Sequence, residues 1–213
     1  MDEPLDIVAV RVLGSLIEKE STTPDNYPLT LNAIVAACNQ TSNRDPVLAL
    51  DEATVSSSLK ELSGRSLVRE VHRSDSRAKR YRHMMSESMN LHPAESAVLC
   101  VLMLRGAQTT GEIRTRTSRL FEFIDLKHLE VTLEALMTLS TPLVASLPRQ
   151  PGQKEARYAH LLSGEPQVET VAPASAEAAE PGRLDALEQA VDSLRAELAE
   201  LRTELEVFKR EFQ

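Results

Sequence analysis

The chain has 213 residues, of which only 3% are aromatic and none is tryptophan, so any core must be built mainly from aliphatic side chains. Its longest apolar run, residues 98–104, is far too short to cross a bilayer. The first residues, Met1-Asp2-Glu3-Pro4, are acidic where a signal peptide would be basic. We therefore expect a cytoplasmic protein without a membrane segment, in which Cys38 and Cys100 are buried thiols rather than a disulfide.

The net charge of −8 is distributed unevenly along the chain. Residues 164–213 hold five Lys and Arg against twelve Asp and Glu, whereas residues 1–88 hold 11 against 13 and residues 89–163 hold eight against seven. The acidity therefore belongs to the C-terminal part, and the rest of the chain is close to neutral. Because a nearly neutral body can carry a local basic surface, the overall charge does not exclude nucleic-acid binding.

Three helices and a β-hairpin are predicted within residues 1–88. Residues 5–20 carry a broad apolar stripe at helical spacing. Thr30 is placed to cap a short second helix, and Asp51 to cap a third. Two β-rich runs on either side of a polar turn then predict a hairpin over residues 67–85.

The same order of elements is predicted again within residues 89–163. A helix begins at Pro93, since proline is favoured in the first helical turn. The run Thr109-x-x-Glu112 is a capping box that opens a second helix. Asp125 can cap a third helix, and residues 143–162 form a second hairpin.

The two predicted units also share local sequence. Arg80-Tyr81-x-His83 in the first hairpin matches Arg157-Tyr158-x-His160 in the second. The same order of elements used twice indicates tandem domains. The sequence thus predicts a mainly α fold with small β-hairpins (α+β), built as two tandem winged helix-turn-helix domains over residues 1–88 and 89–163.

A linker and a coiled coil are predicted after the second domain. Residues 164–182 are rich in Ala, Glu and Pro, a composition typical of a disordered linker. Within residues 183–213, apolar side chains three and four apart form a heptad seam of Leu184, Leu187, Val191, Leu194, Leu198, Leu201, Leu205 and Phe208. Flanking charges favour a parallel dimer, because Glu197 would meet Arg202 of the partner helix. A trimer, or one amphipathic helix folded back on the domains, remains an alternative.

Several short motifs resemble those of a known family. The first half contains Thr22-Thr23-Pro24-x-x-Tyr27-Pro28-Leu29 and Ala37-Cys38-Asn39-Gln40-x-x-Asn43-Arg44-x-Pro46-Val47, and the second contains Leu104-Arg105-Gly106-Ala107-Gln108-Thr109. On these motifs the chain resembles the YceH-like family of uncharacterised bacterial proteins over about residues 5–163. The resemblance implies tandem winged helices, and it brings no established activity and no catalytic residues. One departure is Thr110, where that family often has proline; it affects only a helix start.

Basic residues gather on the first predicted hairpin and the helix before it. The candidate DNA-binding residues are Lys60, Arg69, Arg73, Arg77, Lys79, Arg80 and Arg82. Cations on a hairpin can contact phosphates, which supply most of the non-specific affinity for DNA. The third helix carries no set of Arg, Asn or Gln suited to reading bases. The alternative is a solvated strand pair whose charges merely keep an edge soluble.

The loop after the second helix carries the family-motif residues Asn39, Gln40, Asn43 and Arg44, whose role is open. Such side chains can bond the backbone where a helix ends, and Arg44 could pair with the adjacent Asp45. The same residues could form a binding surface.

The second domain offers a different set of charges. Its third helix carries Glu130 and Glu134, which would repel phosphate. Its second helix carries Arg114, Arg116 and Arg119, which could clamp a DNA backbone or pair with nearby carboxylates. We therefore expect this third helix to serve as an interdomain surface or as a surface for another protein.

No catalytic, cofactor or metal site is predicted. The five histidines show no metal-ligand spacing with either cysteine, and no glycine-rich phosphate loop is present. The sequence favours a dimeric winged-helix protein, similar to transcriptional regulators, that binds double-stranded DNA through its first domain. The rival is a non-enzymatic adaptor that binds proteins through its winged-helix surfaces and its coiled coil.

Overall fold

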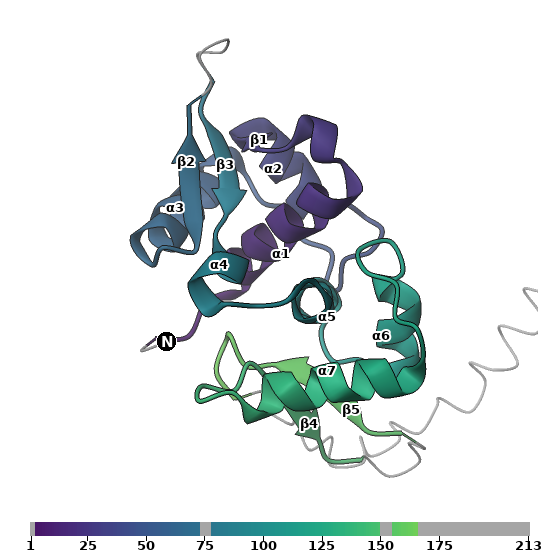
Figure 1. Ribbon diagram of the computed structural model, residues 1–213. Helices are drawn as coiled ribbons and strands as arrows, with labels where there is room; N and C mark the ends of the chain where they lie inside the picture. Colours follow the sequence, from purple (N-terminus) through teal and green to yellow (C-terminus); the bar gives the residue numbers. More distant parts are fainter. Residues whose placement is uncertain (1–2, 73–77, 150–154, 166–213) are drawn as a thin grey trace, which may run out of the picture. The chain divides into compact units, whose positions relative to one another are not determined.

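The computed structural model describes residues 3–72, 78–149 and 155–165, which all belong to one compact unit (Figure 1). Within these residues the chain forms seven α-helices and two small antiparallel sheets. The predicted α+β class is therefore confirmed. The linker predicted over residues 164–182 lies outside the described residues from residue 166 onward, and so does the whole coiled-coil seam. Both therefore stay predictions.

The first half contains the predicted three helices and hairpin. Its helices are α1 (Ile7–Thr22), α2 (Leu31–Cys38) and α3 (Glu52–Gly64), and its hairpin strands are β2 (Val68–Val71) and β3 (Arg80–His83). The predicted caps are confirmed: Thr30 Oγ1 accepts from the backbone N–H of Ala33 at 3.4 Å, and Asp51 Oδ1 accepts from that of Thr54 at 2.7 Å. The first helix starts two residues later than expected because Asp6 caps its N-terminus, and it ends two residues later than expected, at Thr22.

A third strand that the sequence did not predict completes the first sheet. Strand β1 (Leu29–Thr30) pairs antiparallel with β3, which gives the order β1-β3-β2. Two residues are too few to produce an alternating pattern in the sequence. The second half has a matching isolated bridge, in which Gln108 exchanges backbone hydrogen bonds with Tyr158 at 3.0 and 2.7 Å.

The second half repeats the order of the first. Its helices are α5 (Pro93–Arg105), α6 (Thr110–Thr117) and α7 (Leu126–Thr138), followed by strands β4 (Val144–Leu147) and β5 (Arg157–His160). Both sides of the predicted capping box form: Glu112 N–H donates to Thr109 Oγ1 at 3.3 Å, and Thr109 N–H donates to Glu112 Oε2 at 2.9 Å. An unpredicted short helix, α4 (Met85–Met89), and a 3₁₀ turn (Pro24–Asn26) complete the elements.

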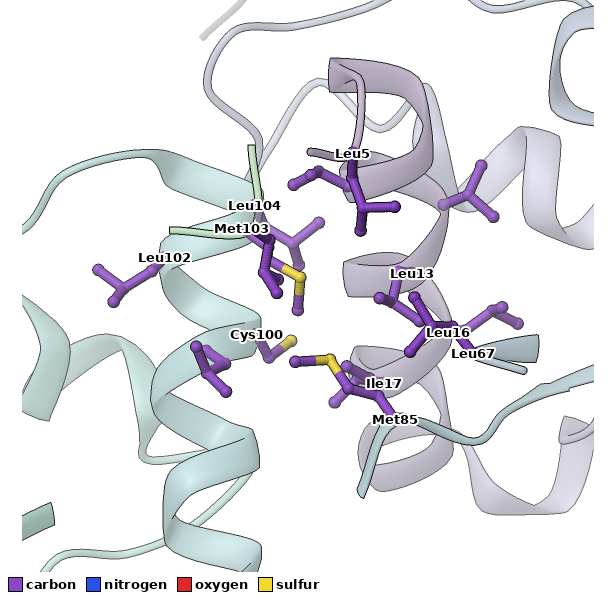
Figure 2. Close-up of a cluster of buried hydrophobic side chains, with 14 of the residues drawn as sticks. Leu5, Leu13, Leu16, Ile17, Leu67, Met85, Cys100, Leu102, Met103 and Leu104 are labelled. Atoms are coloured by element: carbon purple, nitrogen blue, oxygen red, sulfur yellow. The ribbon is translucent and has the colours of Figure 1, made fainter. Parts of the chain in front are cut away.

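Helices α1 and α5 pack against each other and join the two halves. Figure 2 shows Cys100 and Met103 of α5 facing Leu13, Leu16 and Ile17 of α1. The buried apolar side chains form one cluster that includes residues from both halves. Both cysteines are free and buried, as predicted. The boundary predicted at residue 88 stays a prediction, and the structure shows a shared core across it.

Candidate nucleic-acid interface

The register of the first hairpin places its arginines on one face of the sheet. Residues directly opposite in an antiparallel pair point to the same side. Val68 faces His83 and both are buried, so this side turns toward the core. Arg69 faces Arg82 and Val71 faces Arg80 on the other side, which we call the outer face. Helix α3 lies alongside β2 (Figure 1).

Two of these arginines form a like-charge pair. Like charges that lie directly opposite each other on neighbouring strands destabilise a sheet. The positive charge of Arg82 is balanced by an ion pair with Glu87 of α4. Arg69, in contrast, is exposed and has no partner within the described residues. As far as the structure describes the chain, the outer face therefore carries a positive charge at Arg69 that no acidic side chain pairs with.

Arg80 has a structural contact. Its Nη1 donates to the carbonyl of Pro28 at 2.8 Å, which ties the hairpin to the segment before α2. The matching residue of the second half does the same, because Arg157 Nη1 donates to the carbonyl of Ala107 at 3.0 Å. The matching arginines of the two hairpins thus make the same kind of hydrogen bond to a backbone carbonyl. This bond occupies the Arg80 guanidinium, which argues against a role for Arg80 in phosphate binding.

The remaining candidates are differently placed. Lys79 Nζ lies 3.1 Å from Glu70 Oε2 in an exposed pair, which is worth little in water. Lys60 is exposed on α3 and has no partner within the described residues. Arg73 and Arg77 lie outside the described residues. Of the candidate cations, Lys60 and Arg69 are therefore the two that are exposed and have no partner within the described residues.

A buried histidine on the inner face has a partner that the sequence did not suggest. His83 Nε2 lies 2.7 Å from Glu20 Oε2 of α1, and the backbone N–H of His83 donates to the Tyr27 hydroxyl at 2.7 Å. The hydrogen bond to His83 holds the pKa of Glu20 below its usual value. Both side chains line a cavity of about 260 Å³ beside Ser86 and Ser96. These contacts fix the sheet to α1.

The motif loop after α2 is held mainly by its own side chains. The Asn39 amide forms two hydrogen bonds with the backbone of Leu50, both 2.8 Å long. Gln40 accepts from Lys19 Nζ at 3.4 Å, and Asn43, whose φ is +61°, accepts from Arg105 of α5. The backbone N–H of Asp45 donates to the carbonyl of Leu104 at 2.8 Å. These contacts support the scaffold interpretation of the motif.

Arg44 is the centre of this loop. Its side chain is fully buried and pairs with Glu18 of α1 at 2.6 Å, rather than with the adjacent Asp45. It also donates to the carbonyls of Ala37 and Asn43 at 2.9 Å. Buried Arg11 adds bonds from α1 to the carbonyls of Cys38 and Pro46, at 3.1 and 2.6 Å. The loop that leads into α3 is thus fixed by two guanidinium groups.

Helix α7 of the second half presents a surface unlike that of α3. Glu130 and Glu134 are exposed on it, as predicted. Exposed apolar side chains lie among them, since Val131 is 56% exposed and Ile124, just before the helix, is 83% exposed. This combination of acid and apolar groups is unsuited to phosphate.

The described residues place limits on other kinds of site. They contain no group of three or more His, Cys, Asp or Glu side chains that could hold a metal ion. None of the helices in this part of the chain is long and apolar enough to cross a membrane.

His160 provides a pH-dependent prediction for the second half. Burial lowers the pKa of His160 to about 4, and its Nδ1 has no partner within the described residues. The unfolded chain therefore binds more protons than the folded one between about pH 6.5 and pH 4, so stability is full above pH 6.5 and falls as the pH drops. We expect the free energy of unfolding in urea to fall by about 1.4 kcal/mol between pH 7.5 and 5.5. The variant His160→Gln should lack this loss of stability, and the control His72→Gln, at an exposed position, should keep it. If the free energy of unfolding changes equally with pH in both variants, His160 is not the cause.

The comparisons with known proteins agree on one family. A family described as "Protein of unknown function, DUF480" matches residues 5–153. A UPF0502 protein of Geobacter sulfurreducens is 49% identical over 221 residues, and one of Solibacter usitatus is 47% identical over 216 residues, each covering 100% of both chains. A UPF0502 protein of Geotalea daltonii is 54% identical over 168 residues, which cover 79% of this chain and 77% of that one. The predicted resemblance to an uncharacterised bacterial family is thus confirmed, and the chain belongs to the DUF480 family.

Proposed function

We propose that both halves are winged helices and that the first half binds double-stranded DNA. The order α1, β1, α2, α3, β2, β3, with the sheet order β1-β3-β2, supports the winged-helix assignment. In such a fold the third helix and the hairpin lie side by side and can contact a duplex together. The order of the second half, with its bridge from Gln108 to Tyr158, supports the same assignment there.

The observation that carries the DNA proposal is the unpaired charge next to α3. Arg69 is held opposite Arg82 at a cost in stability, and Lys60 is exposed on the adjoining helix. Phosphate groups would relieve this repulsion and supply the partners that the described chain does not. Exposed Ser57 of α3 adds a hydroxyl but no bidentate base contact, so the proposal is for backbone-dominated binding.

The proposal includes parallel self-association through the heptads of residues 184–208. Two first halves carried on one coiled coil would bind one duplex together, and linked sites raise the overall affinity without new contacts. The acidic residues of the C-terminal part do not need to approach the DNA.

The test is anisotropy with a fluorescent random duplex, measured over a series of salt concentrations. In the variant Lys60→Ala/Arg69→Ala we expect affinity at low salt to fall about tenfold and the slope of log K against log[salt] to shrink by about 1.8, because two phosphate contacts are lost. The matched control is Arg114→Ala/Lys127→Ala, which removes from the second half two exposed cations that have no partner in the described part of the chain. No binding by the full chain at micromolar protein, or an equal loss in the control, would contradict the proposal.

A second candidate function is protein binding through α7. The exposed Val131 and Ile124 beside Glu130 and Glu134 favour it, because apolar groups surrounded by charge are typical of protein-binding surfaces. It becomes the preferred function if the duplex experiment fails.

A further inference from the structure

A pocket lined by arginines lies where α5 and α6 meet the first half. Its volume is about 260 Å³. Three guanidinium groups line it, from Arg105 at the end of α5 and from Arg116 and Arg119 on and just after α6. Thr22 of α1 and Asn43 of the motif loop complete it from the first half. We call this the arginine pocket.

The positive charges of the arginine pocket are poorly compensated. Arg119 has no acidic partner within the described residues, and Arg116 has a partly exposed pair with Glu112 at 3.4 Å. Within the described residues, the Arg105 guanidinium donates its hydrogen bond to the neutral side-chain oxygen of Asn43 and forms no ion pair. Burial and, after it, the charge of Arg116 lower the pKa of Arg105, so these two cations are close enough to repel.

The acid in the lining does not neutralise the pocket. Glu18 is a lining residue, but both of its carboxylate oxygens are bound by Arg44, at 3.1 and 2.6 Å. Lys19 lies 3.2 Å from the same carboxylate. The hydrogen bonds of Glu18 are therefore made to Arg44, and its single charge, which also acts on Arg105, is shared with Arg44 and Lys19.

The rest of the lining shows what kind of anion would fit. The hydroxyls of Thr22, Thr115 and Ser118 already donate to backbone carbonyls, so the arginines are the available donors. Buried Val101 and Leu104, with half-buried Leu120, give the pocket an apolar wall. A ligand with an oxyanion at one end and an apolar part at the other matches both surfaces.

We propose that the arginine pocket binds a small organic oxyanion, a phosphate or carboxylate whose charge is held by Arg105, Arg116 and Arg119. Guanidinium groups bind both kinds of oxyanion with charge-assisted hydrogen bonds. A concave site with an apolar wall suits a small molecule better than a duplex backbone, which needs a convex or extended basic surface. Because the lining comes from both halves, the bound anion would also tie α6 to the motif loop. The proposal does not depend on DNA binding.

The experiment measures binding of two probes, inorganic phosphate and citrate, to the full chain by calorimetry and thermal unfolding, with chloride at matched ionic strength as the reference. We expect at least one probe to bind and to raise the unfolding temperature, and the two probes distinguish a phosphate site from a carboxylate site. In Arg119→Gln the affinity should fall about tenfold, which corresponds to the loss of one charge-assisted contact. Arg119 is exposed, so this variant should fold normally, and its unfolding in chloride checks that it does.

The matched control is Arg114→Gln. Arg114 is exposed on the same helix and does not line the pocket, so the variant removes the same charge and should bind as the parent chain does. Equal weakening in both variants would show non-specific attraction and overturn the proposal. The proposal would also be overturned if neither phosphate nor citrate binds. If, in that case, Arg119→Gln weakens binding to a duplex, the pocket arginines contact DNA instead.

Discussion

Replacing Arg44 with methionine is expected to lower the free energy of unfolding by about 3–5 kcal/mol, because the substitution removes the buried partner of a mostly buried carboxylate and leaves only Lys19 beside it. The Arg44 side chain is fully buried, and that of Glu18 is only 13% exposed. The guanidinium also satisfies the carbonyls of Ala37 and Asn43, which methionine cannot do. Urea denaturation at neutral pH measures the effect.

The pH dependence of this loss identifies its cause. Burial by itself raises the pKa of Glu18, but the hydrogen bond and the charge of Arg44 hold it below the usual value. In the parent chain, Glu18 therefore stabilises the fold above pH 4.5, and this contribution is lost as the pH falls. In Arg44→Met the pKa of Glu18 rises, because only Lys19 remains beside it, so the carboxylate becomes protonated at a higher pH than in the parent chain. The difference between variant and parent should be largest at pH 7 and should shrink toward pH 4.

A double variant tests the pairing directly. Apolar replacement of both members of a buried ion pair is often close to neutral, whereas removal of one is strongly destabilising. Arg44→Met/Glu18→Met should therefore recover part of the loss, with the unbonded carbonyls of the motif loop accounting for the rest. The ion pair would be shown not to stabilise the loop if the effects of the two single substitutions on the free energy of unfolding add up. The same would follow if the loss of stability in Arg44→Met did not depend on pH.

Much of the fold could be predicted because its signals are local. Caps such as Thr30, Asp51 and Asp125 act within three residues of themselves, and apolar stripes mark one helix face. The pairing of β1 with β3 could not be predicted, since Leu29 and Tyr81 meet only in the folded chain. The short helix α4 lacks a cap hydrogen bond from a side chain, so it left no signal.

The candidate site could be predicted only in outline. Counting cations along residues 69–82 identified a basic hairpin, but it could not separate Arg69, which has no partner among the described residues, from Arg80, which is bound to the Pro28 carbonyl. Such partners depend on tertiary contacts 52 residues apart in the chain. The arginine pocket was missed for the same reason, because Arg105 and Arg119 come together with Thr22 only through the packing of α5 against α1 and of α6 against α5.

Gly14→Val should be the most damaging single substitution at the contact between the two halves. A Cβ atom at Gly14 would lie 3.0 Å from Leu104 Cδ2 and 3.2 Å from Met103 Cβ, both on α5. The carbonyl of Gly14 also accepts from the Cys100 thiol at 3.4 Å, which shows how closely the two backbones approach. Overpacking of this kind costs about 1–3 kcal/mol, and the two further methyl groups of valine place the expected loss at the upper end.

The matched control for this substitution is Gly111→Val. Gly111 also lies in a helix, but a Cβ atom there would meet nothing within 4 Å, so its effect on the free energy of unfolding should be small. Shortening the opposing side chain should rescue the variant, and we expect Gly14→Val/Leu104→Ala to show a favourable coupling of about 1 kcal/mol in a double-mutant cycle. If the halves unfold together through their shared core, Gly14→Val moves one transition to lower urea concentration. Two separated transitions would instead show that the first and second halves are independent domains joined by a weak contact.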